Sequence, residues 1–281
     1  TMERVVEKQQ TDAFEVWSIG KDEEIGCDSL PHGCSRIGVI VENTADVLDL
    51  FPDFNLEVRV EKISSLPKDH RSIRWIASST AQLESWIDDL PVHQTLEIEL
   101  NQDTEKWILG NQDKIQEKQE RLRFHQPFFE KLSQTSKSDI RNPKQFFEKL
   151  NVSIETSGLP SCIAIGMSIQ NPIARLLKNI FDLDSGRLDT HELSKHHIVS
   201  GYRSKSIRCS DCKVSDRCDG IHINMVRDQG LRLAEPLVEG EWFEEAQKQL
   251  LALYPEPLPR ISLGMKPRGV AKSLPGFASP K

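Results

Sequence analysis

Six cysteines are the residues of this chain whose spacing points most directly to chemistry. Three of them, Cys209, Cys212 and Cys218, form a C-x2-C-x5-C pattern. A gap of two residues lets two thiolates turn back onto one zinc ion or one iron–sulfur cluster. Cys162 stands alone in the segment GLPSC at 158–162. Three plus one makes four ligands, the number that closes either a tetrahedral zinc site or a [4Fe-4S] cluster.

The other two cysteines, Cys27 and Cys34, flank His32 in the segment GCDSLPHGC. A metal site here would need a fourth ligand from elsewhere in the chain. An ordinary loop with free thiols is therefore the favoured interpretation, and the role of these three residues stays open.

Histidines elsewhere in the chain do not converge on a second site. On a helix, His191 and His196 would lie about 140° apart, too far round to bind one ion together. His222 follows the cysteine pattern, and we expect it on a short strand with its polar side outward; a position next to the cluster is the alternative.

Motifs for the common nucleotide and hydrolase sites are missing. The sequence has no G-x-x-x-x-G-K-[ST], no G-x-G-x-x-G and no G-x-S-x-G. Glu97 and Glu99 share one face of an alternating segment. They could point to a substrate inside a barrel, but we expect them on the solvated face of an open sheet.

Composition narrows the class of protein. The 281 residues are 37% apolar and 28% charged, which is typical of a globular chain. No apolar run approaches the roughly 18 residues of a spanning helix, so we expect no membrane partner. A net charge of −7 argues against general nucleic-acid binding. The first residues lack the apolar core of a secretory signal, so we expect a cytoplasmic, reducing location without disulfides.

The elements that must position the cysteines alternate between strand and helix. Strands are predicted at 36–42, 56–61, 73–77 and 96–100, and helices at 79–90, 111–124, after Asn142-Pro143, after Asn171-Pro172 and at 241–254. This alternation predicts an α/β fold with a parallel sheet, in four or five βα units. The expected divisions are an irregular segment at 1–35, a partial βα barrel-like domain at 36–155, an auxiliary cluster domain at 156–240, a terminal helix at 241–254 and a proline-rich tail at 255–281.

The segment 209–236, CSDCKVSDRCDGIHINMVRDQGLRLAEP, together with the upstream GLPSC, carries a family likeness. It resembles the auxiliary-cluster region of radical S-adenosylmethionine enzymes with SPASM or twitch extensions, over roughly residues 95–237. The resemblance implies that Cys162, Cys209, Cys212 and Cys218 bind a [4Fe-4S] cluster in a small domain that follows a partial (β/α) barrel. The C-x3-C-x2-C loop that defines this family is absent from the chain.

The resemblance therefore implies a degenerate relative that does not cleave S-adenosylmethionine. We expect a subunit that works with a partner metalloenzyme in modifying a peptide or protein. Two alternatives remain open at this point. One is a zinc-stapled structural or peptide-binding scaffold, and the other is a stand-alone iron–sulfur enzyme with an open iron position.

Overall fold

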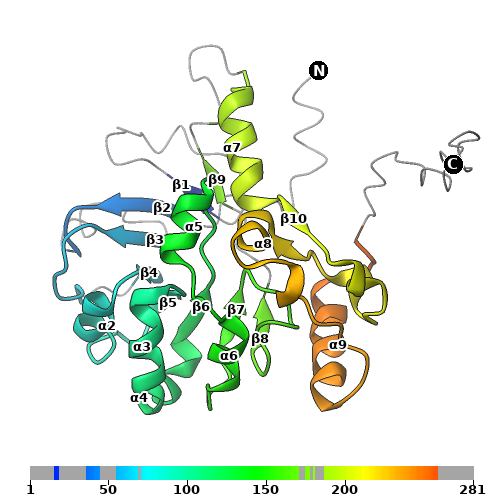
Figure 1. Cartoon of the computed structure of the whole chain (residues 1–281). Coiled ribbons are helices and arrows are strands. Elements are labelled where there is room, and N and C mark those ends of the chain that lie inside the picture. Colours follow the sequence, from blue (N-terminus) through cyan, green and yellow to red (C-terminus); the bar gives the residue numbers. More distant parts are fainter. Residues whose placement is uncertain are drawn as a thin grey trace, which may run out of the picture.

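A computed structural model describes residues 16–18, 36–44, 55–68, 71–170, 175–177, 180 and 187–258. In these residues, nine strands form one sheet in the order β8-β7-β6-β5-β4-β3-β2-β1-β9, and every pairing within it is parallel. Its strands are β1 (Val16–Ser18), β2 (Arg36–Val41), β3 (Asn55–Val60), β4 (Ile73–Ala77), β5 (Thr95–Glu99), β6 (Leu122–His125), β7 (Glu155–Ser157), β8 (Ser168–Gln170) and β9 (Arg175–Leu177). The fold is α/β, as predicted (Figure 1).

In the described residues, helices lie between successive strands from β4 to β7, and further helices follow the sheet (Figure 1). They are α2 (Thr80–Trp86), α3 (Gln102–Gly110), α4 (Gln112–Glu117), α5 (Leu132–Ser138), α6 (Pro143–Glu148), α7 (Thr190–Ser200), α8 (Ile223–Gln229) and α9 (Glu241–Leu253). A second sheet consists of two antiparallel strands, β10 (Arg203–Ser204) and β11 (Ile221–His222). The segment with Cys209, Cys212 and Cys218 lies between these strands in the sequence. Short 3-10 turns lie at η3 (Gln119–Arg121), η5 (Ile207–Ser210), η6 (Ser215–Arg217) and η7 (Leu231–Leu233).

Helix starts follow the capping signals of the sequence. Ser79 and Gln82 form the expected capping box, because each side chain accepts a hydrogen bond from the other's backbone N–H. Asn142 caps α6 by accepting from the N–H of Gln145, and Pro143 occupies the first turn. The signal at 171–172 lies outside the described residues.

One predicted helix is wrong. The segment at 111–124 forms only the short helix α4 and the turn η3, and then becomes β6. Leu122 and Phe124 are buried on one face of β6, which pairs with β5 and β7. Its pairing on both sides outweighs the helical propensity of the charged residues before it.

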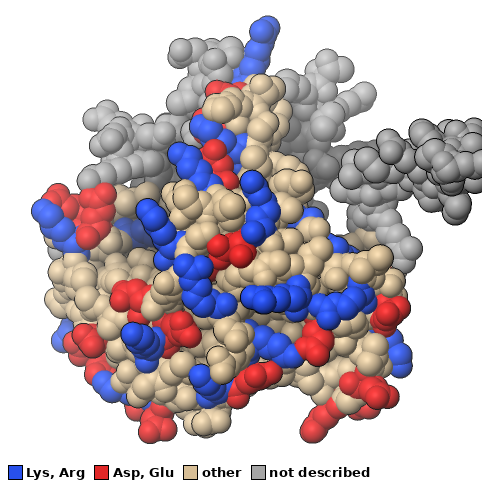
Figure 2. All heavy atoms as spheres, viewed as in Figure 1, with Lys and Arg blue, Asp and Glu red and all other residues tan. Residues whose placement is uncertain are grey.

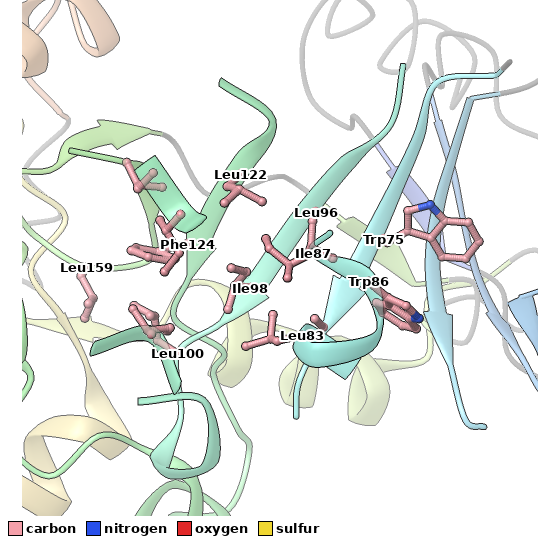
Figure 3. Packing of buried hydrophobic residues seen from close by; sticks show 14 of the residues in the cluster. Trp75, Leu83, Trp86, Ile87, Leu96, Ile98, Leu100, Leu122, Phe124 and Leu159 are labelled. Atoms are coloured by element: carbon pink, nitrogen blue, oxygen red, sulfur yellow. The ribbon is translucent and has the colours of Figure 1, made fainter. Parts of the chain in front are cut away.

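The main core lies between the sheet and its covering helices (Figure 3). The Trp75 and Trp86 rings, from β4 and α2, lie 6.0 Å apart between centroids. Leu96 and Ile98 of β5 point into the same cluster, as their alternation predicts. Leu159, just after β7, also belongs to it, so the GLPSC loop is anchored to the core.

The opposite face of these strands is polar but not solvated. Glu97 and Glu99 are only 1% and 7% exposed, so the prediction of a wet face for them is wrong. Arg59 donates to Glu99 at 2.5 Å, across the intervening strand β4. Buried carboxylates need such partners, because an unpaired buried charge is costly.

The sheet is wider than the predicted four or five units. Strand β1 lies within the segment expected to be irregular, and β7 and β8 continue the sheet past residue 155. Helix α9 packs beside the edge strand β8, where the Gln249 side chain accepts from the N–H of Ile169 at 3.0 Å. This contact satisfies an edge N–H that would otherwise be open. Of the predicted proline-rich tail, only residues 255–258 lie within the described chain.

Candidate functional site

Four cysteines from two segments that are distant in sequence line one cavity. Cys162 comes from the loop after β7, and Cys209, Cys212 and Cys218 come from the segment between β10 and β11. All four are partly buried free thiols. The structure therefore brings together the four residues that the sequence singled out.

The loop that carries Cys162 is held by Gly158 and Leu159. Gly158 has φ +89°, and a Cβ at this position would lie 2.8 Å from the carbonyl oxygen of Gln126 and 3.1 Å from the Phe128 ring. Only glycine lets the chain leave β7 in this conformation without a clash. With Leu159 in the core, the loop has a fixed path to Cys162.

A tight turn holds Cys209 and Cys212. Ser206 caps η5, which contains Cys209, by accepting from the N–H of Arg208 at 3.3 Å. The N–H of Cys212 donates to the carbonyl of Cys209 at 3.2 Å and closes the C-x2-C turn. These local hydrogen bonds turn both cysteines of the pair toward the same cavity.

Backbone N–H groups point at two of the sulfur atoms. The N–H of Gly220 donates to Sγ of Cys218 at 3.3 Å. A hydrogen bond from the backbone of Glu235 to Cys162 opposes the rise that burial causes in the pKa of this thiol. Hydrogen bonds of this kind stabilise thiolates and tune the potential of a cluster bound by them.

Without a metal, two of these thiols hold their protons tightly. Burial raises the pKa of Cys162 to about 12, and the other three sulfurs add to the rise. Burial also raises the pKa of Cys218, against the hydrogen bond from Gly220 and the nearby charge of Lys205. Any metal that binds here must displace these protons.

The thiols are not drawn in around a single point. In the described parts of the chain, no group of three or more His, Cys, Asp or Glu side chains could hold a metal ion as it stands. The four cysteines instead surround a cavity that Lys205, Val214 and Leu237 also line.

The predicted histidine positions have mixed outcomes. His191 and His196 both lie on α7, a helix that the sequence did not predict, so the separation expected on a helix applies to them. His222 is on β11, but its expected outward orientation is wrong: it is 1% exposed, and its ring stacks on Phe128 at 4.5 Å. The segment with Cys27, His32 and Cys34 lies outside the described residues.

Sequence reasoning missed the residues on the other side of the cysteine loop. Arg203 lies over the Phe128 ring at 4.7 Å and donates to the carbonyl of Gly158 at 3.2 Å. No motif marks it, because its partners lie far away in the chain.

Basic side chains are prominent on one face of the molecule, although the net charge is −7 (Figure 2). Figure 2 shows Lys and Arg side chains in a band across the middle of the view, near α8. Within the cavity itself, Lys205 is the basic lining residue among those described.

No helix in the described ranges is long and apolar enough to cross a membrane.

Comparison with protein-family models, with curated proteins and with solved structures finds no match to this chain.

Proposed function

We propose that this chain is an iron–sulfur protein of the radical S-adenosylmethionine type that does not cleave S-adenosylmethionine. In this proposal, Cys162, Cys209, Cys212 and Cys218 hold one [4Fe-4S] cluster. The chain acts in the reducing cytoplasm, as a subunit beside a metalloenzyme that modifies a peptide or protein. The observation that carries the proposal is the meeting of these four thiols around one cavity.

A zinc ion and a [4Fe-4S] cluster require different spacings of the four sulfurs. Four sulfurs bound to one zinc at about 2.3 Å would lie roughly 3.8 Å from one another. In a [4Fe-4S] cluster each cysteine binds a different iron, so the sulfurs stand further apart. The four thiols line one cavity, and metal analysis distinguishes the two arrangements.

The protein groups around the thiols suit a negatively charged cluster. The N–H groups of Gly220 and Glu235 face two sulfurs, and Lys205 lines the cavity. Lys144 of α6 pairs with the Glu235 side chain and lies close enough to Cys162 for their charges to interact. Such donors and cations raise the reduction potential of a cluster.

Four thiolate ligands leave no iron with an open position, so a bound cluster would supply electron transfer. We therefore expect no 5′-deoxyadenosine from S-adenosylmethionine when the chain is incubated alone with dithionite. The product would be measured by liquid chromatography, with a complete radical S-adenosylmethionine enzyme as the positive control. Formation of 5′-deoxyadenosine by this chain alone would contradict the proposal.

Metal analysis of anaerobically purified protein tests the cluster directly. We expect iron and sulfide with broad visible absorption in the wild type, and loss of both in Cys209→Ala and Cys212→Ala. The matched controls are Cys27→Ala and Cys34→Ala, which should keep their iron. Ligand loss should also lower the midpoint of urea unfolding, because metal binding contributes folding free energy.

Other results of these experiments would favour one of the alternative functions or a different set of ligands. Colourless protein that holds one zinc after anaerobic reconstitution would replace this proposal with the zinc-stapled scaffold. Equal loss of iron from both pairs of variants would show that the cysteines were divided wrongly. The protein could also bind iron, leave S-adenosylmethionine intact and still convert a substrate without any partner. This result would favour the stand-alone enzyme.

A further inference from the structure

A second cavity adjoins the cysteine cavity at the carboxyl ends of two strands. The loop Gly158–Ser161 follows β7, and Gln170 ends β8, and both line it. The two cavities share four lining residues, which are Pro160, Ser161, Cys218 and Leu250. Ligands of open parallel sheets bind in crevices beyond the carboxyl ends of the strands, so the position suits a binding site.

The guanidinium of Arg203 faces this cavity without a direct counter-ion. Arg203 is half-buried, and its partners are the face of Phe128 and the carbonyl of Gly158. Within the described chain, the charge of Asp219 acts on Arg203 from the same cavity, but no carboxylate forms an ion pair with Arg203. Arg217, which also lines the cavity, is by contrast paired with Asp216 at 2.5 Å. A partly buried charge without a counter-ion is costly, and an anionic ligand would offset that cost.

The rest of the lining is largely apolar, with a polar rim. Leu159, Ile169 and Leu250 supply apolar surface. At the exposed rim, the hydroxyl of Tyr254 donates to Asp219 at 3.4 Å. A small apolar body would fill such a cavity while a charged group reached Arg203.

We propose that this cavity binds the carboxylate of a small apolar molecule, with Arg203 as the group that recognises it. The fork of the guanidinium matches a carboxylate and can donate two parallel hydrogen bonds to it. The carboxylate could belong to a free apolar amino acid or to the carboxyl terminus of a peptide, and both have the same chemistry at Arg203. In either case the ligand lies beside Cys218. The inference does not depend on a metal at the four thiols.

Isothermal titration calorimetry of the full chain with matched probes tests the inference. N-acetyl-leucine represents a peptide terminus, leucine represents a free amino acid, and N-acetyl-leucinamide has the same shape as the first probe without its charge. We expect at least one of the two carboxylates to bind at least tenfold more tightly than the amide. Which of them binds better identifies the source, and tighter binding of leucine would point to help from Asp219 at the rim.

Variants assign the binding to Arg203. Arg203→Gln should weaken binding of the carboxylate at least tenfold, and Arg203→Lys, which keeps the charge but loses the fork, should weaken it several-fold. The control is Arg141→Gln, an exposed arginine paired with Asp228, which should leave binding unchanged. If Arg203→Gln does not fold, the comparison of acid with amide on the wild type still decides.

Three results would overturn the inference: no binding of either carboxylate up to its solubility, equal binding of acid and amide, or full binding by a folded Arg203→Gln variant. Iron content is measured on the same samples. Carboxylate binding by protein that cannot hold iron would uphold this inference and defeat the cluster. Iron binding without carboxylate binding would support the cluster and overturn this inference.

Discussion

Burial decides the protonation state of Asp139, a carboxyl in the helical layer. Its side chain is 2% exposed, and Gln126 donates to it at 3.2 Å. Burial raises the pKa of Asp139 from 3.8 to about 7, and the nearby charge of Asp228 adds to the rise. The Gln126 hydrogen bond and the charge of Arg141 act in the opposite direction, but they do not outweigh burial.

The raised pKa makes the folded protein more stable at low pH than at high pH with respect to this group. Below about pH 4 the carboxyl is protonated in both states. As the pH rises to about 7, the unfolded chain releases the proton while the folded chain keeps it, so the free energy of unfolding falls. Asp139→Asn, which stays neutral, should therefore be more stable than wild type at pH 8 by about 1–3 kcal/mol.

Urea unfolding at pH 5 and pH 8 measures this difference. The gain of Asp139→Asn over wild type should be larger at pH 8 than at pH 5. Asp88→Asn is the control, because Asp88 is 60% exposed in a surface pair with Lys114 and should change little at either pH. A gain for Asp139→Asn that is the same at both pH values would contradict the assigned protonation state.

At the scale of elements, the turn after β7 links the sheet to the cysteine cavity. Gly158 has both a positive φ and no room for a Cβ, whereas Gly166, at φ +80°, has open space around it. Comparing alanine variants at the two positions therefore separates the cost of backbone strain from the cost of a steric clash. Alanine at either site must adopt an unfavourable φ, and only at Gly158 does it also meet other atoms.

Gly158→Ala should lower the free energy of unfolding by about 2–4 kcal/mol, and Gly166→Ala by only about 1 kcal/mol. The difference arises because Gly158 packs against Gln126 and the Phe128 ring, so β6 or the Cys162 loop must move. Chemical denaturation of both variants measures it, and metal content should fall in Gly158→Ala alone. Equal destabilisation by the two variants would show that the residues around Gly158 can move to accept a Cβ at little cost.

At the scale of the whole molecule, the end of the described chain returns to the cysteine segment. The carbonyl of Tyr254, just after α9, accepts from Arg217 at 3.1 Å, and the N–H of Leu258 donates to the carbonyl of Asp216 at 3.0 Å. Both partners lie in η6, between Cys212 and Cys218. Helix α9 also donates from Trp242 to the carbonyl of Ser161, next to Cys162. The last helix therefore braces both halves of the candidate site.

A chain truncated after Leu253 should hold its metal several-fold more weakly than the full chain, because it loses both contacts to η6. A chain truncated after Leu258 keeps these contacts and is the matched control for metal content. Removing 259–281 should instead weaken the complex with the partner enzyme that we propose. Competition with a chelator measures metal retention, and light scattering with pull-down measures the complex. Equal metal retention by the two truncated chains would show that the brace has no role.

The sequence by itself determined the features that depend on near neighbours along the chain. The alternation of Leu96 and Ile98 with Glu97 predicted a strand, and Ser79 and Asn142 predicted helix starts. These signals are local, because a cap or a strand face is set by residues two to four positions apart. The C-x2-C spacing marked the candidate ligands for the same reason.

Only the tertiary structure decided what lies next to what across the chain. It turned the end of a predicted helix into β6, buried Glu97 and His222, and placed Arg203 over Phe128 beside a second cavity. It also brought the loop of Cys162 to the cavity of the other three cysteines. Each of these outcomes depends on contacts between segments far apart in sequence, whose pairing and packing energies outweigh the local preferences on which sequence patterns depend.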